Sequence, residues 1–168
     1  MIDLDRIPKL QALVKLLDNH IESKKKLHKL VYLLQQAGED FGYRYIYHSY
    51  GVFSPELASD LDTARQDSVL SVERRDDNGM TVYDIRYPSE NPLNISDPGD
   101  IACDHGLIKE LGGRSAAFLE ALSTVVYLGN NYYSGTDLRS KLTELKPGLE
   151  RHFEQAYEFA RDKFEVQV

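Results

Sequence analysis

The chain has 168 residues, a formal net charge of −7 at pH 7 and a single cysteine, Cys103. That length suits one compact domain or two closely packed halves, and it is sufficient to bury a core without covalent cross-links. The negative charge opposes non-specific attraction to nucleic acid or anionic lipid unless a local basic patch overrides it, and the lone thiol excludes an intramolecular disulfide and a cysteine-rich zinc site.

The amino-terminal third of the chain is predicted to form two helices and an extended segment. Apolar residues recur at helical spacing over about 8–19 and again over 27–34, ahead of Gly38, a residue type that often ends helices. Over 41–47 aromatic residues occupy every second position, which places their rings on one side of an extended segment.

A third helix and a hairpin are expected next. The sequence Ser-Pro-Glu at 54–56 favours a helix start, because a hydroxyl caps free N–H groups, proline loses no hydrogen bond there, and the acid meets the positive end of the helix dipole. The runs 69–75 and 80–87 flank turn residues at 77–79, so they are predicted to pair as a β-hairpin. Three helices followed by a hairpin predict a winged-helix-like unit over 1–88.

The carboxyl-terminal half is predicted to be helical. Residues 89–104 are rich in Pro, Asp, Asn and Ser and are expected to form a surface linker. The run 115–128 is apolar on nearly every side, which is typical of a helix enclosed by neighbours, and Pro147 should separate two further helices. We therefore predict a mainly α fold, in which the winged-helix-like unit over 1–88 packs with a helical bundle over 105–168 as one compact domain.

The amino-terminal residues and the hydropathy predict a cytoplasmic protein. Acidic residues stand where the start of a signal peptide would be basic. No uninterrupted apolar run approaches the roughly 20 residues that span a bilayer, so we expect no membrane segment.

Four lysines occupy the first turns of the predicted second helix: Lys24, Lys25, Lys26 and Lys29. The helix dipole is already positive there, so each lysine costs about 0.3 to 1 kcal/mol unless an anion or an acid offsets it. One interpretation is an anion site, where a phosphate or an acidic partner surface meets free backbone N–H groups. The other is a solvated helix face that nearby acids of the same chain neutralise.

The connection before the third helix concentrates titratable aromatic residues, among them Tyr45, His48 and Tyr50. They could form an acid–base pocket, but no spaced carboxylate or nucleophile defines a reaction class. Cys103 and His105 have no second pair of ligands at a metal-binding spacing. We therefore expect no metal, no cofactor and no enzymatic activity.

The predicted third helix carries acidic side chains at positions where a helix that reads DNA needs basic ones. Glu56, Asp60 and Asp62 are expected on its outward face, where carboxylates would meet phosphates. Arg74 and Arg75, near the hairpin tip, are the residues that favour DNA. In this interpretation, the acidic residues of the helix argue against DNA binding more strongly than the two arginines argue for it.

Short motifs in three parts of the chain are formed by Lys26, Leu27, Lys29, Leu30, Tyr32, Leu33, Tyr50, Gly51, Ser54, Leu57, Leu145, Lys146, Pro147 and Leu149. These motifs resemble the YwgA-type family of small bacterial and archaeal proteins and, more distantly, Panacea domains related to SocA-type antitoxins. The resemblance covers nearly the whole chain, with Val52, Phe53 and Gly148 as departures from the family pattern. It implies a mostly helical fold with a winged-helix-like unit, no established enzymatic activity for the YwgA group and protein-neutralising roles for the Panacea relatives.

These observations lead to three hypotheses. The favoured one is a non-enzymatic interaction or regulatory protein, antitoxin-like, that binds a protein partner; a homodimer is compatible with it. The second is a winged-helix DNA-binding regulator that uses Arg74 and Arg75. The third is a small enzyme that uses His48 and the tyrosines. The residues predicted to bind the partner are Lys24, Lys25, Lys26, Lys29, Tyr45, His48, Tyr50, Glu56 and Asp60.

Overall fold

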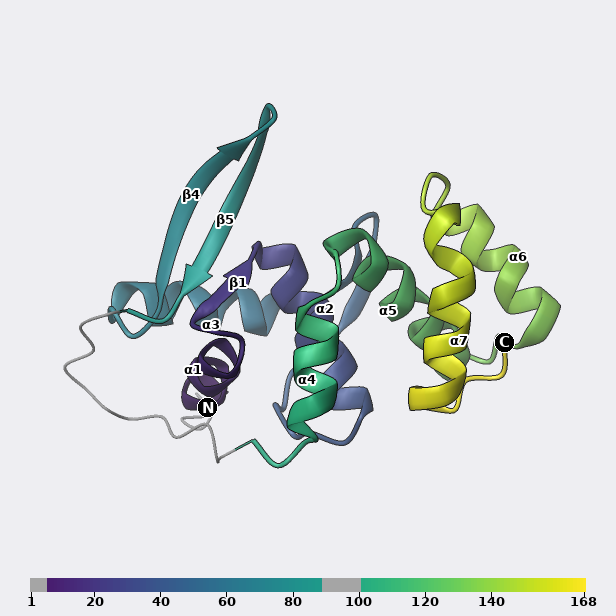
Figure 1. Cartoon of the computed structure of the whole chain (residues 1–168), viewed down its shortest axis with the longest axis horizontal. Helices are drawn as coiled ribbons and strands as arrows, with labels where there is room; N and C mark the ends of the chain where they lie inside the picture. The colour runs from purple at the N-terminus through teal and green to yellow at the C-terminus, as the bar shows by residue number, and fades with distance from the viewer. Residues whose placement is uncertain (1–5, 89–100) are drawn as a thin grey trace.

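The computed structural model describes residues 6–88 and 101–168. The described part is mostly helical and contains two small antiparallel sheets, so the prediction of a mainly α protein is confirmed at that level. Figure 1 shows the β4–β5 hairpin projecting near one end of the molecule, helices α6 and α7 at the other end, and α2 and α5 between them.

The amino-terminal half places three helices around a three-stranded sheet. Its elements are α1 Arg6–Leu16, β1 His20–Glu22, α2 Lys24–Gln36, α3 Pro55–Gln66, β4 Ser71–Asp77 and β5 Met80–Arg86. The predicted end of the first helix was wrong, because Asp18 and Asn19 take φ angles of 58° and 64° and turn the chain into β1. The sequence analysis missed this three-residue strand.

The three-stranded sheet has the order β1-β5-β4, with antiparallel pairing throughout. Ile85 in the central strand lies opposite Ile21 on one side and Val72 on the other. Asn78 and Gly79 form the hairpin turn with φ angles of 49° and 82°, a conformation that these two residue types tolerate. The predicted hairpin is therefore confirmed.

The aromatic connection between α2 and α3 faces inward, as its alternation predicts. Phe41 and Tyr43 are buried, and the connection ends in a short hairpin made of β2 Ile46–His48 and β3 Gly51–Phe53. The Ser54 hydroxyl accepts a hydrogen bond from the Leu57 N–H at 3.2 Å, which confirms the predicted cap of α3.

The carboxyl-terminal half is built around α5. Its elements are α4 His105–Gly112, α5 Ala116–Asn130, α6 Gly135–Leu145, a 3-10 turn at Glu150–His152 and α7 Phe153–Phe164. Helix α5 packs against α2, α6 and α7, so the predicted enclosed helix is confirmed as the central core element. Helix α4, which the sequence analysis missed, begins where the Asp104 side chain accepts from the Gly106 N–H at 2.8 Å.

The predicted linker over 89–104 is described only from residue 101 onward. Ile101 is buried, and the Cys103 N–H donates to Glu39 Oε2 at 2.8 Å. This end of the segment is therefore anchored to the amino-terminal half and is not free surface. Residues 89–100 lie outside the described part, where the linker stays a prediction.

Buried side chains of both halves form one continuous hydrophobic core. Contacts between α2 and α5 join the halves. Within residues 6–88 and 101–168, no helix combines the length and the apolar character needed to cross a membrane.

Candidate functional site

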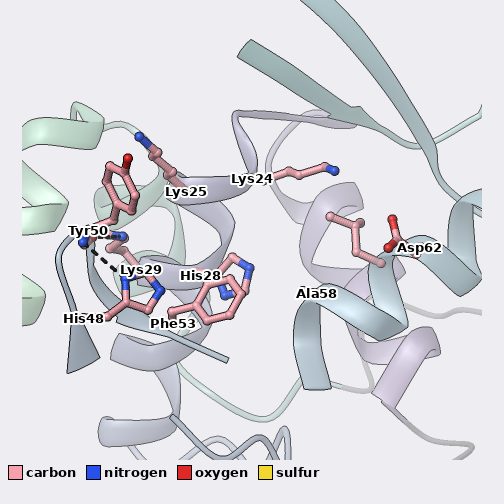
Figure 2. Close-up of a pocket in the computed structure, with 10 residues that line it drawn as sticks. Lys24, Lys25, His28, Lys29, His48, Tyr50, Phe53, Ala58 and Asp62 are labelled. Carbon is pink, nitrogen blue, oxygen red and sulfur yellow. Dashed lines mark hydrogen bonds between the residues drawn. The ribbon is translucent and has the colours of Figure 1, made fainter. Parts of the chain in front are cut away.

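A pocket of about 200 Å³ lies between the first turns of α2, the β2–β3 hairpin and the middle of α3. Its lining combines three lysines and a histidine from α2, three aromatic side chains from the hairpin region, and Asp62 from α3. Figure 2 shows Lys25 and Tyr50 on one side, Lys24 and Asp62 on the other, and His28 between them. We call this site the α2 pocket.

His28 forms part of the pocket floor and has a defined tautomer. The residue is only 5% exposed and its ring stacks on Phe53, with 4.6 Å between the ring centroids. The backbone N–H of Ser54 donates to His28 Nδ1 at 3.2 Å, so the proton of the neutral ring is on Nε2. Burial, together with Lys29, His48 and Lys24, lowers the pKa of His28 to about 4. His28 therefore stays neutral at pH 7, with an Nε2–H donor.

Lys24 and Lys25 hold positive charge at the rim of the pocket. The Lys25 ammonium lies 4.4 Å from the centre of the Tyr50 ring, and that of Lys24 lies 4.5 Å from the centre of the Tyr83 ring. Cation–π contacts of this kind leave most of each charge available to an anion. Within the part of the chain that the structure describes, neither ammonium forms an ion pair with a carboxylate. Carboxylates of the described residues thus do not neutralise the charges of these two lysines through direct ion pairs.

Lys26 and Lys29 differ from the solvated lysines that the sequence predicts, because both are buried. Lys26 Nζ donates to the carbonyl of Gly112 at 2.7 Å and so faces α4, while Lys29 Nζ donates to the carbonyl of Tyr50 at 2.7 Å. Helical rotation explains the difference, since positions 26 and 29 lie on the inner side of α2 next to its apolar stripe. Both lysines were predicted to contact the partner. Lys26 instead points away from the pocket, and Lys29 reaches the pocket only from beneath.

Two buried lysines lie close together below the β2–β3 hairpin, and one of them is paired with a carboxylate. Lys146 is 5% exposed and its Nζ donates to Glu120 Oε1 at 2.7 Å. A β-carbon built on Gly51 would lie 3.6 Å from Lys146 Nζ and 3.8 Å from Lys29 Nζ, so both ammonium groups converge beneath this glycine. Burial, with the charges of Lys146 and Lys25 adding to it and that of Glu120 opposing it, lowers the pKa of Lys29 to about 8. We call Lys29, Lys146 and Glu120 the lysine cluster.

The outward acidic face predicted for α3 was largely wrong. Asp60 is buried, accepts from the Tyr43 hydroxyl at 2.8 Å and lies 2.9 Å from Arg6 Nε. Glu56 pairs with Arg6 at 2.9 Å and with Arg44 at 3.0 Å. Asp60 follows Leu57 by three positions, which turns it toward the core and toward α1. Neither carboxylate is therefore a free contact for a partner.

The remaining exposed charges of α3 are Asp62 and Arg65, so this helix presents a nearly neutral surface. On the hairpin, Arg74 lies 3.6 Å from a carboxylate oxygen of Asp76, and Arg75 lies 2.8 Å from one of Asp84. Both arginines are thus already paired with acids of the same hairpin.

Tyr45 was also predicted to contact the partner, but its side chain points inward. It lies beneath α2, where its hydroxyl donates to the carbonyl of His28 at 2.8 Å and its ring meets the Tyr32 ring edge-on. Its even spacing with Phe41 and Tyr43 already indicated this inward side. Tyr45 therefore supports the pocket floor from below.

The structure thus brings together five of the predicted partner residues: Lys24, Lys25, Lys29, His48 and Tyr50. It also shows two members that the sequence analysis missed, His28 and Phe53. Helical spacing offered a clue to His28, since it follows Lys24 by four positions. Phe53 directly precedes Ser54, the residue that caps α3.

The α2 pocket can donate hydrogen bonds and accommodate negative charge above an apolar floor. His48 Nδ1 accepts from the Tyr50 N–H at 3.3 Å, so one nitrogen of each pocket histidine is occupied by a backbone donor. Among residues 6–88 and 101–168, no three His, Cys, Asp or Glu side chains come close enough to hold a metal ion. The lining thus places hydrogen-bond donors and positive charge next to apolar and aromatic side chains.

Comparison with known proteins shows one informative similarity. The chain is 28% identical to the uncharacterised protein YwgA of Bacillus subtilis (strain 168) over 116 residues, which cover 64% of this chain and 65% of the relative. The resemblance to the YwgA group thus has support over part of the chain, and the alignment spans less than two thirds of that relative. No family model matches the chain. No solved structure matches it either.

Proposed function

We propose that this chain is a non-enzymatic regulatory module that binds an acidic segment of a protein partner at the α2 pocket. The observation that carries the proposal is a cationic, aromatic pocket on a chain whose net charge is −7. Lys24 and Lys25 provide charge complementarity to carboxylates, and Tyr50, which is 59% exposed, extends the pocket into an aromatic contact surface. An antitoxin-like role in the cytoplasm belongs to the same proposal.

The hydrogen bonds of the two histidines favour binding over catalysis. His28 has a pKa of about 4, its Nδ1 is occupied by the Ser54 N–H and its Nε2 carries the proton, so neither nitrogen can accept a proton at pH 7. His48 receives the Tyr50 N–H on one nitrogen, and no hydrogen bond to a carboxylate orients its ring among the described residues. These features support a recognition site.

DNA binding is the second candidate, and chain topology supports it. The order of α1, β1, α2, α3 and the β4–β5 hairpin, with β5 between β1 and β4, is compatible with the winged-helix-like unit that we propose for residues 1–88. Affinity for duplex DNA comes largely from lysines and arginines that neutralise phosphates. The nearly neutral surface of α3 and the paired Arg74 and Arg75 offer few of these, so we favour a protein partner.

Affinity capture with a matched charge control tests the proposal. Lys25→Gln and Lys163→Gln each remove one exposed positive charge, the first at the pocket and the second on α7. We expect wild type and Lys163→Gln to capture the same protein from native lysate and Lys25→Gln to recover several-fold less of it. Mass spectrometry quantifies the captured protein, and nucleic acid is quantified from the same eluate.

Two results would count against this function. Equal recovery of the captured protein by Lys25→Gln and Lys163→Gln would show that the pocket is not part of the interface. Recovery of nucleic acid that is lost when Arg74 and Arg75 are replaced by Gln would establish the DNA-binding alternative.

A further inference from the structure

We propose that the α2 pocket recognises a carboxylate that stands next to an aromatic or aliphatic group of the bound segment. In this arrangement His28 Nε2–H and the Lys25 ammonium hold the carboxylate, and Phe53 with Leu61 contacts the apolar neighbour. The inference names the ligand chemistry of the proposed function and rests on it.

His28 provides the observation that points to a ligand. Its side chain is more than nine-tenths buried and lines the pocket, and Nε2–H has no hydrogen-bond acceptor within the part of the chain that the structure describes. The nitrogen itself is not fully enclosed, so its N–H is open to the pocket. The Ser54 N–H on Nδ1 and the stacked Phe53 ring hold this donor in one orientation. A fixed donor of this kind is suited to an incoming oxygen.

The surrounding electrostatics favour negative charge at the same place. Lys24 and Lys25 occupy the first turn of α2, which contains no acidic residue, so their charges add to the positive end of the helix dipole. Ser23 caps the Lys26 N–H at 3.1 Å. Figure 2 shows the lysine side chains extending to opposite sides of the floor formed by His28 and Phe53.

A carboxylate fits this lining better than a phosphate. Asp62 lies at the rim, and its negative charge repels a dianion more than a monoanion. The pocket contains no arginine, whose planar guanidinium binds phosphate with two parallel hydrogen bonds. Ala58 and Leu61 from α3 complete an apolar wall opposite the hairpin, which suits the carbon atoms next to a carboxylate.

Binding of small probes to the full chain tests the inference. Benzoate carries a carboxylate on a ring, benzamide is its neutral isostere, and phenyl phosphate is a dianion. Nuclear magnetic resonance follows the His28 Nε2–H and Phe53 ring signals during each titration. We expect benzoate to shift both signals and to bind at least about tenfold more tightly than benzamide, because the charge-assisted bonds require the carboxylate.

Variants locate the binding site. Lys25→Gln should weaken benzoate binding about three- to tenfold, while Lys163→Gln should leave it unchanged. His28→Gln should abolish the difference between benzoate and benzamide; because this buried variant can fail to fold, the His28 signal of the wild type serves as the independent readout. Equal affinity for benzamide and benzoate, or shifts outside the pocket, would overturn the inference. Tighter binding of phenyl phosphate than of benzoate would overturn the choice of a carboxylate.

The outcomes also separate this inference from the proposed function. If Lys25→Gln loses the captured protein while benzoate does not bind the wild type, the partner interaction stands and carboxylate recognition is wrong. If benzoate binds as described but no protein capture depends on Lys25, carboxylate recognition stands and the protein partner is wrong.

Discussion

Replacing Glu120 by Gln is expected to lower the free energy of unfolding by about 2 to 3 kcal/mol, since it removes the carboxylate of the lysine cluster. Lys146 is 5% exposed and would lose its ion pair at 2.7 Å, while the buried ammonium of Lys29 stays close by. Glu120 itself is 30% exposed, so solvent screens part of this loss. Urea denaturation of the wild type and the variant at pH 7 measures the difference.

Glu110→Gln is the matched control for this substitution. Glu110 is exposed on α4, so the same change there should alter stability by less than about 0.5 kcal/mol. A loss for Glu120→Gln no larger than for Glu110→Gln would show that the lysine cluster does not depend on this carboxylate.

The same variant has an expected pH signature. The folded-state pKa of Lys29, about 8, lies below its ordinary value of 10.5, so between these pH values the unfolded chain binds more protons and stability rises with pH. Glu120 raises the pKa of Lys29, and its removal should extend this rise to lower pH. Unfolding curves between pH 6 and 10 show whether the rise begins earlier in the variant.

Gly51→Val is expected to cost about 3 kcal/mol of stability, the second large effect. Gly51 has a φ of 89°, where a β-branched residue is strained, and the added methyl groups would press on the two ammonium groups below. Because the β2–β3 hairpin carries His48 and Tyr50, the variant should also bind pocket ligands more weakly. Thermal and urea unfolding measure the stability loss.

A smaller substitution separates strain from crowding. Gly51→Ala keeps the φ penalty without branched methyl groups and should cost about 1 to 2 kcal/mol. Gly113→Ala places the same side chain at a φ of −79°, which is ordinary for alanine, and should be nearly neutral. Equal stability of all three variants and the wild type would show that the backbone at Gly51 is not strained for other residues.

Features that depend on local chemistry were predictable from the sequence. Ser54 caps α3 through its own hydroxyl, and Asn78-Gly79 turns the hairpin through its own backbone preferences, so neither needs a distant partner. The enclosed character of α5 was likewise visible in its nearly continuous apolar sequence.

Features that depend on distant residues were not predictable in this way. The inward position of Asp60 depends on Arg6 and Tyr43, which come from other segments, so the sequence wrongly indicated an acidic surface on α3. A lone histidine such as His28 on an apolar helix face is usually a core residue, and only the structure shows that one of its nitrogens lines a pocket. The lysine cluster joins α2 to α5 and to the end of α6, a combination without a sequence pattern.

Photo-crosslinking tests most directly whether the partner binds at the α2 pocket. A benzophenone amino acid replaces Tyr50, which is 59% exposed at the pocket, or Tyr132, which is fully exposed after α5. Irradiation in native lysate is expected to join a distinct protein to the chain from position 50 and not from position 132, with less product when Lys25→Gln is added. Identical products from both positions, crosslinks only between copies of this chain, or crosslinks to nucleic acid would contradict the account.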